Sequence, residues 1–309
     1  MRQVDGFLNV SKPLGWTSHD VVGFVRRRIG QQRVGHAGTL DPAATGVLPL
    51  CLGRATRLAE RVAAGSKLYA ADVRFGQATD TCDAEGRVLP AEPAWVAAPE
   101  RLDLDAITNA LGNLLGTIEQ VPPSYSALKV AGEAAYVRAR RGEVVALASR
   151  LVTIYGLAVL AWAPPQLSLV VRCSTGTYVR ALARDLGAAL GCPAHLDALI
   201  RLAVGPFRLA DALSLEALEQ AVAARHWEQW VEPADTVTLD LPAAVLGAET
   251  ARHFSYGRSW TAAGDSKPRD ARAYDFTGRF LGLLRAGDAG NRWQPALSFV
   301  YDAAAENLC

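Results

Sequence analysis

The sequence predicts an α+β protein whose main part is a mixed, largely antiparallel sheet flanked by helices, followed by a small β-rich domain. Strand-like and helix-like apolar patterns do not alternate regularly along the chain, which argues against a doubly wound parallel sheet. Beyond about Asp240 the pattern changes to short apolar runs with frequent glycines. A length of 309 residues suits two unequal domains, so we predict a first domain at 1–238 and a second at 239–309.

The N-terminal residues predict a strand, a helix and a glycine-rich loop, in that order. Phe7–Val10 is a short apolar run ended by a turn that contains proline and glycine, as expected of a strand. Thr17 or Ser18 can cap a helix that Gly30 ends. The apolar stripe of this helix consists of Val21, Val22, Phe24, Val25 and Ile29. The glycine-rich stretch 35–46 predicts a loop.

The remaining elements of the first domain follow from the same apolar periodicities. Predicted strands are Val47–Leu52, Lys67–Phe75, Val152–Leu160 and Leu167–Cys173. Predicted helices are Leu104–Leu115, Tyr178–Leu190 and roughly Leu215–Trp230. An acidic turn, Asp80–Gly86, follows the second of the strands. The segment from Pro122 to Arg150 carries five basic and two acidic residues, which is typical of a solvated surface segment between strands.

Composition indicates a soluble intracellular protein. Half of the residues are apolar and a fifth are charged, and the first residues lack the features of a signal peptide. No apolar run reaches the roughly 18 residues of a membrane-spanning helix, so we expect a cytoplasmic location and no membrane partner. The five cysteines include no CxxC pair, and the histidines show no ligand spacing. We therefore expect neither a disulfide scaffold nor a metal site.

Positive charge is concentrated near the N-terminus, although the net charge is only +1. Residues 1–61 contain nine Lys or Arg against four Asp or Glu. Only four of the 32 basic residues are lysine, and arginine suits bidentate contacts with phosphate. Because a GC-rich genome also produces arginine-rich proteins, the local excess is the more useful observation. It favours a nucleic-acid partner that binds through a patch.

The densest chemical signal is the stretch Arg33–Gly46. It holds three glycines, one proline and the carboxylate of Asp41 in fourteen residues, which describes a sharply shaped loop that can approach a ligand closely. No GxxxxGK[ST] pattern follows, so the stretch is not a phosphate-binding P-loop. An Asp-Pro pair alone is usually only a turn, and it is the whole string that indicates a site.

The string GHAGTLDP at 35–42, followed by ATG at 44–46 and by Leu48-Pro49, resembles the catalytic motif of the tRNA pseudouridine synthases that act on the T arm. Four further blocks resemble the same family in the same order. They are the amino-terminal motif at Gly6–Val10 with Lys12-Pro13, the tyrosine motif at Lys67–Tyr69, the insertion at Pro123–Lys129 and the arginine motif at Cys173–Arg180. Together the blocks span about 6–205, two thirds of the chain.

The resemblance implies an enzyme that isomerises uridine to pseudouridine at position 55 in the T loop of tRNA by base flipping and an aspartate-dependent mechanism. It further implies that 1–238 is the catalytic domain, with an RNA-clamping insertion at about 123–150, and that 239–309 is a small PUA-like domain that binds RNA. The chemistry agrees, because the reaction breaks one C–N bond and forms one C–C bond on the same base. We expect no cofactor, no metal and no obligatory protein partner, and a monomer acting on the T arm of tRNA.

By the same resemblance, Asp41 is the catalytic carboxylate, and Arg180 pairs with it and keeps it ionised. Tyr69 stacks on the flipped uracil and is a candidate for proton transfer. Two positions depart from the family pattern. Thr175 stands where lysine is common, and Ile200 stands where arginine is common, so each removes a cation near the rim of the pocket.

Four further residues are expected to contact substrate or RNA by resemblance. His36 touches RNA where the base has left the stack, and Leu199 borders the uracil. Tyr178 packs under the catalytic pocket. Lys12 either positions the catalytic loop or contacts phosphate.

Three other functions remain open. A guide-dependent synthase shares the GTLDP loop at 38–42, but it needs protein partners and a guide RNA, and it generally carries a more basic tail than the acidic end at 302–306. A non-catalytic RNA-binding or RNA-folding protein has no need of Asp41, Tyr69 and Arg180 in register. A hydrolase that uses Asp41 lacks a convincing second carboxylate or histidine base.

Overall fold

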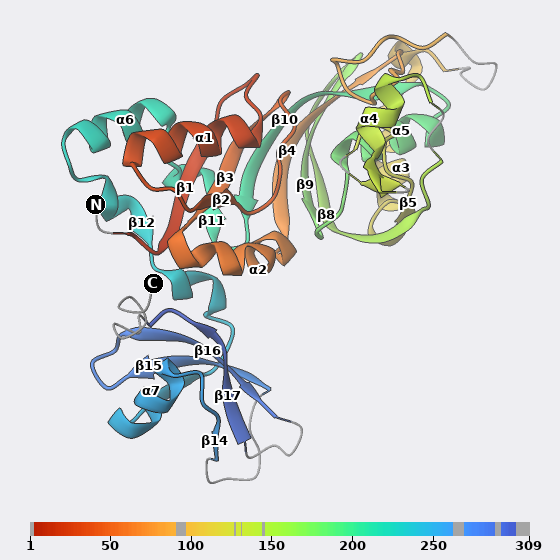
Figure 1. Cartoon of the computed structure of the whole chain (residues 1–309). Helices are drawn as coiled ribbons and strands as arrows, with labels where there is room; N and C mark the ends of the chain where they lie inside the picture. The colour runs from red at the N-terminus through yellow and green to blue at the C-terminus, as the bar shows by residue number, and fades with distance from the viewer. Residues whose placement is uncertain are drawn as a thin grey trace.

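The computed structural model describes residues 3–90, 97–126, 128–130, 132–143, 146–261, 269–287 and 292–300. It has a larger part built on an extended sheet and a smaller part built on a curled sheet, which lies below the larger one in Figure 1. The chain passes between them through the 3-10 segment η5, Ala234–Thr238. The predicted domain boundary after residue 238 lies at this passage.

The large sheet contains ten strands among the described residues, in the order β12-β1-β3-β10-β4-β9-β8-β5, with β2 beside β3 and β11 beside β10. The strands are β1 (Gly6–Lys12), β2 (Val34–His36), β3 (Ala44–Leu52), β4 (Lys67–Phe75), β5 (Gly116–Gln120), β8 (Arg150–Ala163), β9 (Gln166–Cys173), β10 (Ala194–Val204), β11 (Phe207–Arg208) and β12 (Val231–Glu232). The pairing of β3 with β10 is parallel and the other pairings are antiparallel. The predicted mixed, largely antiparallel sheet is confirmed.

The helices of the larger part connect or cover these strands. They are α1 (Ser18–Ile29), α2 (Ala59–Ala64), α3 (Leu104–Gly112), α4 (Ala135–Arg140), α5 (Val179–Ala189) and α6 (Leu215–Ala223), with 3-10 segments η1 (Gly53–Leu58), η2 (Pro99–Arg101), η3 (Leu209–Asp211) and η4 (Trp227–Trp230). Thr17 caps α1 through a capping box with Asp20, and Gly30 ends it in a left-handed conformation with φ of 65°. Both ends of this helix are as the sequence predicts.

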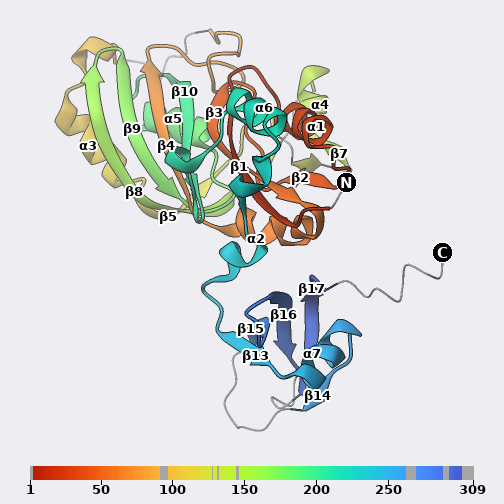
Figure 2. The ribbon, with the colours of Figure 1, turned by 90° about the vertical axis from the view of Figure 1, so that its left-hand side faces the viewer.

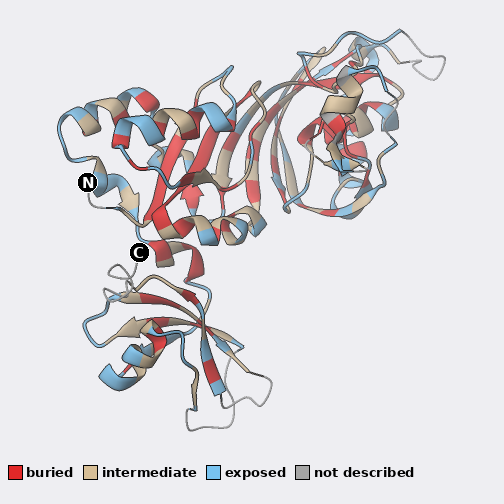
Figure 3. Ribbon diagram, in the orientation of Figure 1, coloured by how far each residue is buried: buried red, intermediate tan, exposed pale blue. Residues whose placement is uncertain are grey.

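Two helical layers cover different halves of the large sheet. Helices α1 and α6 pack on β1 and β3, whereas α3 and α5 lie inside the curl formed by β4, β9 and β8 (Figure 2). Figure 3 shows the buried residues along the central strands and on the helix sides that face them. Strand β10 joins the two halves, because it pairs with β3 on one side and β4 on the other. The junction of the halves is where the functional residues meet.

Strand β10 and the edge strand β5 were not predicted from the sequence. In β10 the apolar pattern is interrupted by Asp197 and Arg201, and the pairing with β4 shifts register beside both residues. Such bulges break the two-residue alternation by which strands are recognised. Strand β5 is short and largely exposed, so it carries little apolar signal.

Predicted and observed bounds differ at several elements, most clearly at two helices and one loop. The helix predicted at Leu104–Leu115 ends at Gly112, and the helix predicted to reach Trp230 ends at Ala223, with η4 as a separate turn. The loop predicted at 35–46 is shorter, because β2 extends to His36 and β3 begins at Ala44. Residues 37–43 form the loop proper.

The smaller part is a five-stranded sheet with one helix against it. Its elements are β13 (Ala243–Leu246), α7 (Ala248–Ser255), β14 (Trp260–Thr261), β15 (Asp270–Asp275), β16 (Phe280–Ala286) and β17 (Arg292–Ser298), in the strand order β13-β15-β16-β17-β14. It is held to the connecting segment by a hydrogen bond of 2.6 Å from the Tyr274 hydroxyl to Asp235. On the other side of that segment, Arg61 of α2 contacts Asp240 through two hydrogen bonds of 2.6 Å.

Two further expectations concern the acidic stretch near the C-terminus and membrane-spanning helices. The acidic stretch at 302–306 lies outside the described residues. Among the helices of the described ranges, none is long and apolar enough to cross a membrane.

Candidate active site

The loop 37–43 between β2 and β3 presents Asp41 at the junction of the two halves of the sheet. Gly46, just beyond the loop, has φ of 102°, and a Cβ atom there would collide with the backbone of Arg201 on β10. Only glycine therefore allows β3 to start in parallel beside β10, where Leu199 pairs with Ala44. The close approach of these strands fixes where the loop emerges.

Two fully buried cations hold the carbonyl groups of this loop. Arg201 donates to the carbonyl oxygens of Gly38 at 2.9 Å and Thr39 at 3.2 Å, and its Nε donates to Val47 O at 2.8 Å. Because an arginine removed from water needs acceptors for its N–H groups, these bonds fix the side chain and the loop together. Arg201 is thus part of the scaffold of the loop.

Lys12 holds the other end of the loop. Its ammonium is fully buried and donates to the carbonyl oxygens of Trp16 at 2.6 Å, Pro13 at 2.9 Å and Pro42 at 3.3 Å. Burial lowers the pKa of Lys12 to about 8, with Asp41 raising it and Arg201 lowering it further. Of the two predicted roles, this geometry fits positioning of the loop. Direct contact with phosphate does not fit a buried side chain.

Ser18, the first residue of α1, secures the middle of the loop. Its hydroxyl accepts the Leu40 N–H at 2.9 Å and donates to the Leu40 carbonyl at 3.1 Å. Leu40 is buried directly before Asp41, so its backbone cannot move without breaking both bonds. The loop is therefore fixed from β1, α1 and β10, three separate segments of the chain.

Asp41 forms the predicted ion pair with Arg180, at 3.0 Å between Oδ2 and NH2. Arg180 also contacts Asp83 at 3.3 Å. The three side chains differ in exposure, with 47% for Asp41, 11% for Asp83 and 8% for Arg180. Arg180 lies in the first turn of α5, where the helix dipole disfavours a cation, so the two carboxylates stabilise a charge that the helix alone would not. Asp41 is the most exposed member of this group.

Arg180 has two further acceptors that hold it in place. It donates to the carbonyl oxygens of Thr81 at 3.1 Å and Tyr125 at 3.0 Å. Asp83 is itself held, because it accepts from the Thr81 hydroxyl and from the Glu85 N–H at 3.2 Å. The guanidinium is thus fixed independently of Asp41.

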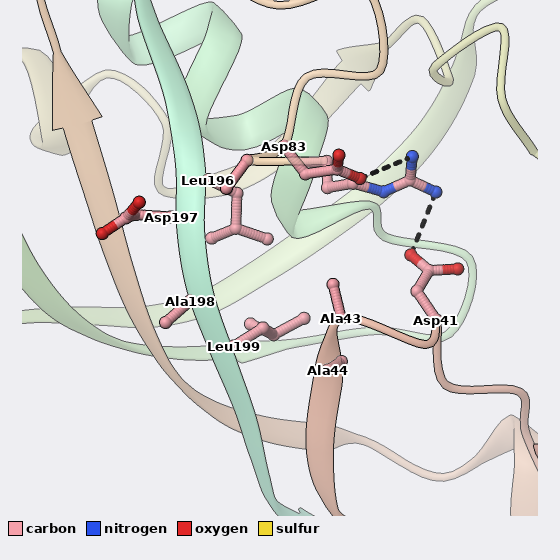
Figure 4. A pocket seen from close by; sticks show the side chains of 10 residues that line it. Asp41, Ala43, Ala44, Asp83, Leu196, Asp197, Ala198 and Leu199 are labelled. Atoms are coloured by element: carbon pink, nitrogen blue, oxygen red, sulfur yellow. Dashed lines mark ion pairs between the residues drawn. The ribbon is translucent and has the colours of Figure 1, made fainter. Parts of the chain in front are cut away.

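A pocket of about 280 Å³, open to solvent, lies between the loop, the turn after β4 and β10. Arg180 bridges Asp41 and Asp83, and Figure 4 draws these two ion pairs as dashed lines, with Leu196 and Leu199 on the wall formed by β10. The lining residues are Asp41, Ala43, Ala44, Asp83, Ala84, Arg180, Leu196, Asp197, Ala198 and Leu199. An apolar wall with charge at one side is the arrangement expected for a flat, partly polar ligand.

Tyr69 is buried and is not one of the residues that line this pocket in the structure. It is buried in the cluster that contains Leu40 and Ala44, and it pairs with Arg201 across the β4–β10 ladder. Burial raises the pKa of the Tyr69 hydroxyl, and the adjacent Arg201 opposes that rise. The prediction that Tyr69 stacks on a base therefore requires the pocket to open toward β4.

Two other predicted contact residues lie outside the pocket lining. His36, at the end of β2, is half-buried and packs edge-on against His19 with ring centroids 5.4 Å apart. Burial lowers the pKa of His36, and its Nδ1 atom is enclosed without a hydrogen-bond partner. Tyr178 precedes α5, its backbone is bound by Gln120 at the root of the insertion, and it does not line the pocket.

Three residues of the site were not assigned from the sequence: Asp83, Arg201 and Ser18. Asp83 belongs to an acidic turn that the sequence shows but whose partner it does not reveal. A signal for Arg201 existed, since a single cation inside the apolar run LIRLAV is typical of a buried, hydrogen-bonded arginine. The two departures from the family pattern, Thr175 and Ile200, are both exposed.

No metal-binding group is evident in the described ranges. They contain no cluster of three or more His, Cys, Asp or Glu side chains that could hold an ion. The four described cysteines are free, and burial raises the pKa of each thiol.

Comparison with known proteins gives concordant matches over most of the chain. Residues 26–179 match the family described as TruB family pseudouridylate synthase (N terminal domain), and residues 180–251 match the tRNA pseudouridylate synthase B C-terminal domain. The protein named tRNA pseudouridine synthase B from Arthrobacter sp. (strain FB24) is 44% identical over 310 residues, covering 96% of this chain and 97% of that protein. Its namesake from Thermobifida fusca (strain YX) is 44% identical over 307 residues, covering 96% and 99%.

Solved structures share the fold at low sequence identity. The structure titled "Structure of H/ACA RNP bound to a substrate RNA containing 2'-deoxyuridine" contains a chain that is 20% identical, with a TM-score of 0.72 and coverage of 96% of this chain and 86% of that one. A chain of a Cbf5-Nop10-Gar1 complex is 23% identical, with a TM-score of 0.69 and coverage of 91% and 78%. At these identities the likeness establishes the fold alone.

Proposed function

The chain belongs to the TruB family of pseudouridylate synthases, and on this premise we propose that it isomerises uridine to pseudouridine at position 55 in the T loop of tRNA. The observation that carries the proposal is the ion pair of Asp41 with the buried Arg180 at the rim of the pocket. It supplies one ionised carboxylate beside an apolar wall, which is what an isomerisation that transfers no group to or from the base requires.

Asp41 is proposed as the catalytic carboxylate. One guanidinium faces two carboxylates, so the group of Asp41, Asp83 and Arg180 carries a net charge of −1 and one carboxylate is in excess. Asp83 is buried and held by its own turn, whereas Asp41 is half exposed. Asp41 can therefore leave the pair to react with the flipped nucleotide while Asp83 keeps Arg180 in position. Arg180 is the ion-pair partner of Asp41 before and after that step.

Tyr69 is proposed to stack on the flipped uracil and to move a proton. Because burial raises the pKa of its hydroxyl, the group is a neutral phenol near pH 7 and can donate a hydrogen bond. Leu199 is proposed to border the uracil from β10, where it lines the pocket. His36 is proposed to touch RNA where the base has left the stack, and Tyr178 to pack under the catalytic pocket.

The remaining organisation is proposed by family likeness. Residues 1–238 form the catalytic domain, with the insertion at about 123–150 closing over RNA, and 239–309 form a PUA-like RNA-binding domain. The protein acts in the cytoplasm as a monomer, without a cofactor and without an obligatory protein partner. Its relatives named tRNA pseudouridine synthase B support tRNA as the substrate.

The experiment that tests this proposal is incubation of the purified protein with an unmodified tRNA transcript, followed by mapping of pseudouridine. We expect complete conversion at position 55 and none with Asp41→Asn. Recognition by shape further predicts that an isolated T-arm hairpin is modified and that an unstructured oligonucleotide of the same sequence is modified poorly. A protein that modified nothing until guide RNA and partner proteins were added would be the guided type of synthase. Binding of tRNA without any conversion, with or without those additions, would indicate an RNA-folding protein.

A further inference from the structure

The two ends of the insertion are joined to neighbouring strands of the large sheet at one pair of facing residues. Gln120, the last residue of β5, pairs directly with Arg150, the first residue of β8. Both residues contact Tyr178, which occupies the N-cap position of α5. Gln120 does so by hydrogen bonds, and the Arg150 guanidinium lies 5.9 Å from the centre of the Tyr178 ring. The two stems of the insertion therefore meet the start of the helix that carries Arg180.

Gln120 binds the backbone of Tyr178 on both sides. Its Oε1 accepts the Tyr178 N–H at 2.8 Å, and its Nε2 donates to the Tyr178 carbonyl at 3.2 Å. The side chain is fully buried, so water cannot replace these bonds. Tyr178 has no side-chain oxygen that could reach back to cap the helix, and the helix start is fixed by Gln120 instead.

The first residues of the insertion continue along the same helix. Arg184 donates to the Val121 carbonyl at 2.9 Å, one helical turn beyond Arg180. Arg180 donates through NH2 to the Tyr125 carbonyl at 3.0 Å, and the same nitrogen pairs with Asp41 at 3.0 Å. The guanidinium that faces the catalytic loop is therefore shared with the root of the insertion.

We propose that Gln120 is a positioning residue that fixes the root of the insertion against the start of α5 and thereby sets the place of Arg180 relative to Asp41. A displacement of the stems when RNA meets the insertion is transmitted through Gln120 to the partner of Asp41. The inference rests on the proposed roles of Asp41 and Arg180 and adds a residue that touches neither substrate nor the reacting atoms.

The chain offers a matched control for this residue. Gln31 is also a buried glutamine whose amide binds both backbone groups of one residue, accepting the Val4 N–H at 3.0 Å and donating to the Val4 carbonyl at 2.9 Å. It fastens the N-terminal residues to the end of α1, away from the pocket. Gln120→Leu and Gln31→Leu therefore remove the same pair of backbone hydrogen bonds at two places, and Gln31 has one further, longer bond to the Arg33 carbonyl at 3.4 Å.

The test compares these variants in single turnover on saturating tRNA, with tRNA affinity and melting temperature measured in parallel. Both variants should lower the melting temperature similarly. Only Gln120→Leu should slow the conversion, by about 10–100-fold, because a small misplacement near a reacting group has effects of that size. Its dissociation constant for tRNA should stay within about 3-fold of wild type, since binding comes from phosphate and shape contacts. An unchanged rate, or an equal loss in Gln31→Leu, would overturn the proposal.

A second measurement asks whether the effect runs through Arg180. In an Arg180→Lys background, Gln120→Leu should slow the reaction much less than it does in the wild type, because residues of one network are not additive. Additive losses would overturn the transmission through Arg180. If Gln120→Leu does not fold, Gln120→Asn, whose amide is too short to reach Tyr178, is compared with Gln31→Asn. Absence of conversion by the wild-type protein would remove the proposed function, and an active Asp41→Asn would remove the proposed role of Asp41. An inactive Asp41→Asn beside a wild-type rate in Gln120→Leu would remove only this inference.

Discussion

The Asp41 loop at 37–43 and the segment 121–149, which holds most of the insertion, meet at Arg180, but they are stabilised in opposite ways. Buried groups from β1, α1 and β10 hold the loop, and each of them binds loop backbone. The insertion is tied to the rest of the protein at its root, where α5 binds Val121 and Tyr125. Farther out, the ion pairs of its described residues join Arg138 and Arg141 to Glu133 and Glu143, all on partly exposed side chains.

This difference between the loop and the insertion indicates where the protein requires a fixed geometry. Charged groups act most strongly on a reaction when they are already in place, because no reorganisation is then needed during the step. The loop satisfies that condition before any RNA is bound. The described residues of the insertion include few that are buried, so we propose that its final arrangement is set by the RNA that it meets.

The largest effect is expected from Asp41→Asn, which keeps the shape of the fixed loop and removes its charge. Turnover should be abolished, while tRNA affinity stays within a few-fold because binding does not depend on this carboxylate. Pseudouridine formed under single-turnover conditions is the measurement. Detectable turnover by the variant would show that fixing the loop serves some purpose other than presenting Asp41.

The next effect is expected from Tyr69→Phe, which leaves the ring behind the loop and removes only the hydroxyl. If that hydroxyl moves a proton, the single-turnover rate should fall by about 10²–10⁴-fold with near-normal RNA affinity. Tyr69→Ala should be at least as slow, because stacking is lost as well. A phenylalanine variant close to wild type would limit Tyr69 to packing and stacking, and the proton would then pass to Asp41.

A smaller effect, on the order of 10²-fold in rate, is expected from Lys12→Met, which removes one of the buried cations of the loop.

Lys12 also predicts a pH dependence of stability and activity. Burial lowers the pKa of Lys12 from 10.5 to about 8, so in the folded protein the ammonium loses its proton as the pH rises through about 8. The unfolded chain keeps that proton up to about 10.5, and so stability from this group rises with pH in this window. Activity should nevertheless fall there, because the loop loses an N–H donor.

Lys67 provides the control for this pH dependence. It is buried, burial lowers its pKa to about 8, and its ammonium bonds the Ala63 carbonyl at the end of α2 instead of the loop. The decline of the single-turnover rate above pH 8 should therefore persist in Lys67→Met and disappear in the slow Lys12→Met variant. The reverse outcome would place the titrating group away from the catalytic loop.

The same contrast explains how much of the site could be predicted from the sequence. Asp41 and Arg180 lie inside two motifs, so their pairing follows from the resemblance of those motifs to one family. Arg201 and Gly38 are 163 positions apart and meet only because β10 inserts beside β3. No local pattern records such a contact, and β10 itself was missed because its bulges break the alternation of a strand.

The elements that were predicted well are those whose signals are local. The ends of α1 follow from Thr17 and Gly30, and β4 was predicted with its observed bounds because its residues alternate between buried and partly exposed. The connection of the insertion to α5 is not local. Gln120 is an ordinary polar residue at the end of a short edge strand, and only the tertiary structure brings its amide to Tyr178.

The smallest effect is expected from Arg141→Ala, which removes the most connected ion pairs of the outer insertion. Arg141 contacts Glu133 and Glu143, but its side chain is half exposed, and ion pairs in water contribute little to stability. The melting temperature should not change measurably, and the single-turnover rate on saturating tRNA should stay within about 2-fold of wild type, as expected for a surface side chain remote from the reacting groups. Glu133→Gln should behave in the same way, because it removes one of the same pairs from the other side. A marked loss of melting temperature in both variants would mean that the insertion is stabilised along its length and not only at its root. In that case the opposition between a fixed loop and an insertion ordered by RNA would fail, and Gln120 would be one anchor among several.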